Sequence, residues 1–151
     1  MVNIGVLISG GGTNLQAIID NINNGKINGE IKLVISNRKD AYGLVRAKKA
    51  NIETLYLDRK KFNSEEEYNE KIVGELKRRN IKLVVLAGYL KVLSKGFIEK
   101  YRNKIINIHP SLIPSFCGKG YYGERIHEMV LKHGVKITGV TVHFVDEGTD
   151  T

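Results

Sequence analysis

Asn107 and His109 are the residues whose types and spacing best suit chemistry, and they stand in the run Asn-Ile-His-Pro-Ser-Leu-Ile-Pro at 107–114. They alternate along an apolar stretch typical of a strand, so both side chains are expected to leave the same face. An amide can donate a hydrogen bond to an oxygen that gains negative charge, and an imidazole can donate one or move a proton. The pattern therefore favours a reaction that passes through an oxyanion.

A carboxylate near the imidazole would orient it and favour its charged form. Candidates follow the last apolar stretch of the chain, and they are Asp146, Glu147 and Asp150. Such a cluster is equally typical of a solvated turn. The spacing alone leaves open which of these carboxylates would face a site.

The stretch Ser-Gly-Gly-Gly-Thr-Asn at 9–14 joins an apolar run to residues with helical spacing. Glycines let backbone N–H groups approach an anion, and a helix N-terminus favours negative charge. The loop lacks the Gly-Lys-Ser/Thr of NTPase phosphate loops, and Leu15 replaces the third glycine of the dinucleotide fingerprint. It therefore predicts an anion site about as strongly as a plain turn, in which Thr13 or Asn14 caps the helix.

Strand and helix patterns alternate along the chain, which predicts an α/β fold with a mostly parallel sheet. The expected strands are 2–8, 31–35, 54–57, 83–87, 105–108 and 136–145, and the helices lie around 13–22, 42–50, 64–76, 95–101 and 126–130. Ligands of such sheets bind at the carboxyl ends of the strands. Residues 10–12, 88–93 and 107–114 each follow a strand directly, so we expect them to meet in one crevice.

The composition fits one domain spanning residues 1–151, with 42% hydrophobic residues and a net charge of +8. The charge is best explained by a solvated surface, and less strongly by anionic small substrates or nucleic acid. No apolar run approaches the length of a membrane span, and no signal peptide is evident. A single cysteine and the absence of paired histidines predict no metal, and the simplest location is the cytoplasm.

Several motifs carry a resemblance to a known family. They are Leu-Ile-Ser-Gly-Gly-Gly-Thr-Asn-Leu-Gln-Ala-Ile at 7–18, Val-Ile-Ser-Asn at 34–37, Val-Leu-Ala-Gly-Tyr-Leu at 85–90, the run at 107–114, and Val-His-Phe-Val-Asp-Glu-Gly-Thr-Asp at 142–150. Together they resemble the folate-dependent formyltransferases, and within them the phosphoribosylglycinamide formyltransferases. The resemblance implies a Rossmann-like, mostly parallel sheet with helices on both faces. It also implies formyl transfer from 10-formyltetrahydrofolate to the amine of glycinamide ribonucleotide in purine synthesis.

The resemblance assigns residues to each role. Asn107, His109 and Asp150 would be catalytic, with Asp150 chosen over its acidic neighbours as the partner of His109. The phosphate of the ribonucleotide would be held by Gly12, Thr13 and Asn14. The folate pocket would be formed by Leu90, Val92, Leu93, Asn107, Asp146 and Asp150. Small-molecule substrates are implied, without metal, nucleic acid or membrane, for a monomer or weak homodimer.

The family normally continues beyond the position that matches Thr151, so the domain is expected to be C-terminally truncated and to lack its C-terminal strand and helices. Glu65 stands where some members carry an arginine near the folate. Two alternatives stay open: another folate-dependent formyltransferase or formyltetrahydrofolate hydrolase, and a non-catalytic phosphate- or nucleotide-binding module.

Overall fold

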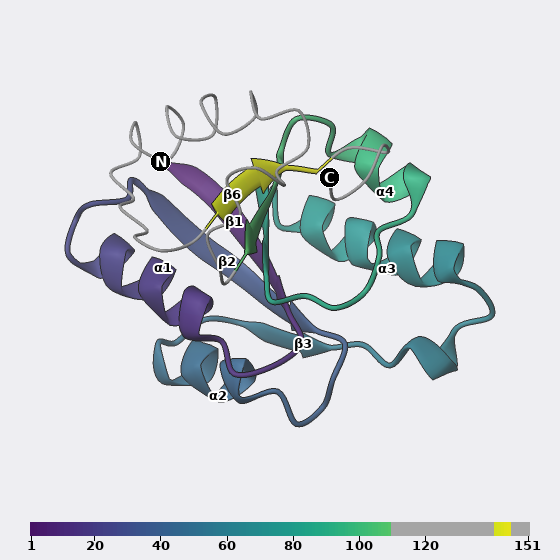
Figure 1. Ribbon diagram of the computed structural model, residues 1–151, viewed down its shortest axis with the longest axis horizontal. Coiled ribbons are helices and arrows are strands. Elements are labelled where there is room, and N and C mark those ends of the chain that lie inside the picture. Colours follow the sequence, from purple (N-terminus) through teal and green to yellow (C-terminus); the bar gives the residue numbers. More distant parts are fainter. Residues whose placement is uncertain (110–140, 146–151) are drawn as a thin grey trace.

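The computed structural model describes residues 1–109 and 141–145, and its strands form one sheet in the order β3-β2-β1-β4-β5-β6 (Figure 1). The strands are β1 Val2–Ile8, β2 Gly29–Ser36, β3 Thr54–Tyr56, β4 Leu83–Ala87, β5 Ile105–His109 and β6 Thr141–Phe144. Neighbours from β3 to β5 are parallel, and β6 runs antiparallel to β5. The predicted mostly parallel α/β sheet is confirmed.

Helices connect the parallel strands. They are α1 Thr13–Asn23, α2 Tyr42–Lys49, α3 Glu65–Arg78 and α4 Lys95–Lys100, with a short 3-10 turn at Arg59–Lys61. Ser64 caps α3, because the Glu67 N–H donates to Ser64 Oγ at 3.1 Å. The predicted helix around 126–130 and the first part of the predicted strand 136–145 lie outside the described residues.

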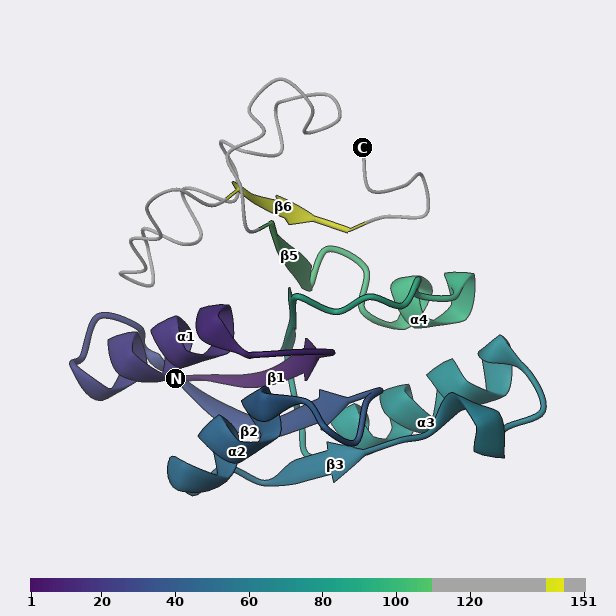
Figure 2. The same cartoon turned by 60° about the horizontal axis from the view of Figure 1, so that its bottom comes forward.

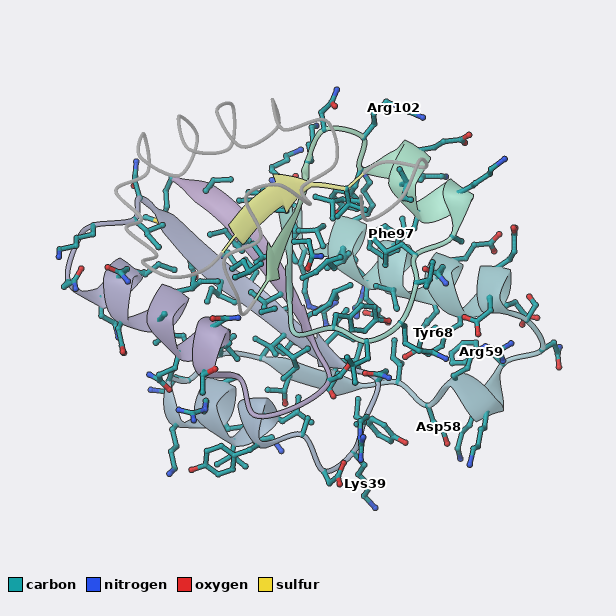
Figure 3. All side chains as sticks on the ribbon, in the orientation of Figure 1. Lys39, Asp58, Arg59, Tyr68, Phe97 and Arg102 are labelled. Atoms are coloured by element: carbon teal, nitrogen blue, oxygen red, sulfur yellow. The ribbon has the colours of Figure 1, made fainter. Side chains whose placement is uncertain are left out.

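The helices cover both faces of the sheet, as predicted (Figure 2). On one face, α1 and α2 bury Leu15, Ile18 and Leu44 against the sheet. On the other face, α3 and α4 bury a second cluster that includes Tyr68 and Phe97. Figure 3 shows these two rings inside the molecule, whereas Lys39 projects outward. No helix in the described ranges is long and apolar enough to cross a membrane.

Two local expectations differ from the structure. Thr13 and Asn14 do not cap α1, because its N-cap is Gly12 in the left-handed conformation and no side chain makes the capping hydrogen bond. A glycine adopts φ of 77° without the penalty that a side chain would bring. Strand β2 begins at Gly29 rather than at residue 31, since Gly29 pairs with Val2 of β1.

Candidate active site

The candidate site lies where β1, β4 and β5 end side by side. Leu7 pairs with Leu86, and Leu86 in turn pairs with Asn107, so the three strands end at the same edge of the sheet. The segments that follow β1 and β4 also touch, since the Leu90 N–H donates to Ser9 Oγ at 2.9 Å. The predicted meeting of the first two segments is confirmed, and the end of β5 lies beside them.

The glycine loop at 10–12 is held closely against the start of α2. The Gly43 N–H donates to the Gly10 carbonyl at 3.0 Å, and a Cβ added to Gly12 would lie 2.6 Å from Gly43 Cα. Since α1 has neither a side-chain cap nor an acidic residue in its first turn, its N-terminal N–H groups can be offered to an anion. Thr13 and Asn14 therefore stand in a suitable place for a phosphate.

Arg46 of α2 adds positive charge beside this loop, and sequence reasoning did not single it out. Its Nε donates to the Gly11 carbonyl at 2.7 Å, and its guanidinium lies over the Tyr42 ring at 5.1 Å from the centroid. These contacts fix both the loop and the cation. The charge favours an anionic ligand at the α1 N-terminus. The one sequence feature that could have pointed to Arg46 is its position four residues after Tyr42.

The segment after β4 carries the residues that the resemblance assigns to folate. Leu90 is 75% exposed and Val92 is 87% exposed, whereas Leu93 is 7% exposed and packs in the core. A cavity of about 450 Å³ is lined by Glu65 and residues 90–94. Two large exposed apolar side chains beside a cavity are suited to contact the flat, apolar part of a ligand.

Glu65 does not leave a free negative charge at this cavity. Its Oε1 lies 2.8 Å from Arg59 Nε and 3.6 Å from Lys91 Nζ. The hydrogen bond from Arg59 holds the pKa of the Glu65 carboxyl below its usual value. The carboxylate is therefore paired with two cations on the side of the cavity nearest α3.

Asn107 is half-buried in β5, between Leu86 of β4 and His143 of β6 in the register of the sheet. His109 is the last residue of β5 and pairs with Thr141. The side chain of His109, together with Asp146 and Asp150, lies outside the description. The pairing of His109 with Asp150 therefore stays a prediction.

Two further polar residues, Ser9 and Asn37, belong to the motifs that carry the resemblance, but the sequence analysis gave neither of them a role in the site. Ser9 is 3% exposed, and its Oγ donates to Asn37 Oδ1 at 2.5 Å. In the sequence, the only sign of these residues was a polar side chain directly after an apolar strand.

Among the described residues, no three His, Cys, Asp or Glu side chains form a group that could hold a metal ion.

Comparisons with known proteins agree with this geometry. The family model described as formyl transferase matches residues 2–151. The phosphoribosylglycinamide formyltransferase of Haemophilus influenzae is 46% identical over 150 residues, covering 99% of this chain and 68% of that protein. The trifunctional purine biosynthetic protein adenosine-3 of Gallus gallus is 42% identical over 99% of this chain, which spans 14% of that protein.

Solved structures give the same relationship. The glycinamide ribonucleotide transformylase 1 of Symbiobacterium toebii superposes with a TM-score of 0.81 at 43% identity, covering 99% of this chain and 68% of that one. That of Geobacillus kaustophilus gives a TM-score of 0.80 at 38% identity and covers 100% of this chain and 78% of the other. The fold expected from the resemblance is thus confirmed, and the chain belongs to the formyl transferase family.

Proposed function

We propose that this chain transfers the formyl group of 10-formyltetrahydrofolate to the amine of 5'-phosphoribosylglycinamide, a step in de novo purine (IMP) biosynthesis. One observation carries the proposal: the uncapped glycine loop of α1 and the apolar Leu90 segment meet beside the strand that bears Asn107. A phosphate-bearing acceptor and a flat donor would thereby reach the same strand end. The relatives' names supply the acceptor and the formyl group, and the resemblance supplies the folate donor.

The ribonucleotide would bind through its phosphate at Gly12, Thr13 and Asn14. The free N–H groups of the first turn of α1 would donate to the phosphate oxygens, and the Arg46 guanidinium would add positive charge nearby. This orientation leaves the glycyl amine free to reach toward β5. A ligand without the phosphate would lose these contacts.

The folate would lie along residues 90–93, with its pterin near Asn107, Asp146 and Asp150. Exposed Leu90 and Val92 offer apolar surface to the rings, whereas buried Leu93 supports the segment from behind. Covering these side chains with a ligand would remove apolar surface from water, which stabilises the complex. The folate is a cosubstrate in this scheme, and the reaction needs no metal ion.

The chemistry is an acyl transfer. The amine nitrogen attacks the formyl carbon, a C–N bond forms, and the carbonyl oxygen becomes an oxyanion to which Asn107 and His109 donate hydrogen bonds. The bond from carbon to N10 of the folate then breaks. The amine loses a proton and N10 gains one, a movement that His109 assists while Asp150 favours its charged form.

The test is transfer from 10-formyltetrahydrofolate to glycinamide ribonucleotide by the wild type and by Asn107→Ala. Loss of one oxyanion donor should lower kcat at least ~100-fold. Asn3→Ala is the matched control, because Asn3 donates to the Asn80 carbonyl at 3.1 Å at the opposite end of β1. The control should stay within about twofold of the wild type. Near-normal turnover in Asn107→Ala would refute the assigned role.

Assays with other acceptors distinguish the proposed function from the alternative functions. Formyl transfer to tRNA, or release of formate to water, in place of transfer to glycinamide ribonucleotide would identify another formyltransferase or a hydrolase. Binding of phosphate without any binding of folate would identify a non-catalytic module. Each of these results would overturn the proposed function.

A further inference from the structure

Ser9 lies at the centre of the candidate site and has no role in the chemistry proposed above. It is the first residue after β1, it is 3% exposed, and its hydroxyl makes hydrogen bonds in two directions. The hydroxyl donates to Asn37 Oδ1 at 2.5 Å and accepts from the Leu90 N–H at 2.9 Å. One small side chain thus connects the segments that follow β1, β2 and β4.

The other hydrogen bonds that hold these two segments lie on the sides that face away from each other. Gly43 and Arg46 hold the carbonyls of Gly10 and Gly11 to α2. At the far end of the Leu90 segment, the Ser94 N–H donates to Asn69 Oδ1 of α3 at 3.2 Å. Ser9 therefore supplies the hydrogen bond between the two segments on the side where they face each other.

The connection is placed where it would set the distance between two ligands. Ser9 directly precedes the glycine loop, and Leu90 is both its hydrogen-bond partner and an exposed residue of the apolar segment. Acyl transfer requires the attacking nitrogen and the formyl carbon to approach to roughly 3–3.5 Å, and small errors in this placement cost large factors in rate. A link between the two binding segments acts on that approach.

We propose that Ser9 is a positioning residue that fixes the Leu90 segment relative to the glycine loop, and so aligns the bound folate with the amine of the bound ribonucleotide. This proposal rests on the proposed function. Asn37 acts with Ser9, because its Oδ1 accepts the hydrogen bond of the Ser9 hydroxyl, which leaves a lone pair of Oγ directed at the Leu90 N–H. Neither residue is assigned a contact with the reacting atoms.

Ser9→Ala tests the proposal against Ser36→Ala. Ser36 is also buried at the end of a central strand, but its hydroxyl bonds only locally, donating to the Arg38 carbonyl at 2.7 Å and accepting from the Arg38 N–H at 2.9 Å. Both variants lose a buried hydroxyl that makes two hydrogen bonds. They therefore share the general cost to folding and differ in whether the link between the segments is lost.

Ser9→Ala should lower kcat at least about tenfold and raise the KM for folate, because the donor is no longer aligned. The KM for the ribonucleotide should change by less than about twofold, since Gly43 and Arg46 still hold the glycine loop. Ser36→Ala should leave all three constants close to those of the wild type. Equal kinetic effects of the two substitutions would overturn the proposal while leaving the proposed function intact.

Amide hydrogen exchange at Leu90 gives a readout that does not depend on activity. The exchange rate should rise at least about tenfold in Ser9→Ala and in Asn37→Ala, and stay unchanged in Ser36→Ala. An unchanged rate in Ser9→Ala would overturn the link itself. If Leu90 exchanged faster in Ser9→Ala while the wild type transferred no formyl group, the link would stand and the proposed function alone would be refuted.

Discussion

At the scale of single residues, Glu75 shows how α3 accommodates a carboxylate on a residue that is only 8% exposed. Its oxygens lie 2.7 Å from Lys71 Nζ and 2.8 Å from Arg79 Nη1, and Arg79 also binds Glu53 Oε2 at 2.6 Å. The cluster fastens α3 to the chain that enters β3. The hydrogen bond from Lys71, followed by those from Arg78 and Arg79, lowers the pKa of Glu75 to about 2.

Replacing Glu75 by Gln should therefore destabilise the protein in a pH-dependent way. A folded-state pKa of about 2, against an ordinary value of 4.5, means that the carboxylate stabilises the fold above pH 4.5. This contribution is lost as the pH falls through about 2. Allowing for solvent around Lys71 and Arg78, we expect a loss of about 2 kcal/mol at pH 7 from urea unfolding, shrinking as the pH is lowered to 3.

Glu30→Gln is the control for this measurement. Glu30 pairs with Lys32 at 3.0 Å on the surface, where both side chains are well exposed. Its loss should cost under about 0.5 kcal/mol at any pH, as is usual for exposed ion pairs. Equal destabilisation by the two substitutions would show that burial of Glu75 adds nothing to the strength of its contacts.

At the scale of elements, the glycine loop depends on how α2 packs against it. Gly12 has φ of 77°, and a side chain there would press on the backbone of Gly43. We expect Gly12→Ala to lower the free energy of unfolding by about 2 kcal/mol, because alanine is strained at this φ and its Cβ would clash with Gly43. Relief of the strain and the clash would move the loop, so binding of the ribonucleotide phosphate should also weaken.

Gly11→Ala is the matched control within the same loop. A Cβ at Gly11 would meet nothing within 4 Å, and its φ lies outside the left-handed region. Its stability should stay within about 0.5 kcal/mol of the wild type in thermal or urea unfolding. If both substitutions destabilised equally, the close approach of α1 and α2 would not be what limits residue 12.

The elements themselves were largely predictable because their patterns are local. The apolar run of β4 is typical of a strand buried on both faces, and the spacing of Leu15, Ile18 and Ile19 is typical of the buried face of a helix. Of the two alternatives left open for the glycine loop, the one in which Thr13 or Asn14 caps α1 is wrong, because the N-cap is Gly12 in the left-handed conformation. The bond between Ser9 and Leu90 joins residues 81 positions apart, and no local pattern reports such a contact.

At the scale of the whole molecule, the strand order explains why the candidate site lies where the central parallel strands end. The order β3-β2-β1-β4-β5-β6 places β1 and β4 at the centre, with the chain turning outward in opposite directions from them. Ligands of open α/β sheets bind at such a switch point. The order follows from pairings between distant strands, whereas the alternation of strands and helices was visible in the sequence.

Because both ligands would contact segments that belong to different strands, each should stabilise the whole fold rather than one loop. At 100 times its Kd, glycinamide ribonucleotide should add about 2.7 kcal/mol to the free energy of unfolding. For a chain of 151 residues this corresponds to a rise in Tm of about 5–10 °C, measurable by calorimetry. At the same concentration the unphosphorylated nucleoside analogue should give a much smaller rise, since it cannot use the N-terminus of α1. Equal rises in Tm with both compounds would show that the glycine loop does not bind the phosphate.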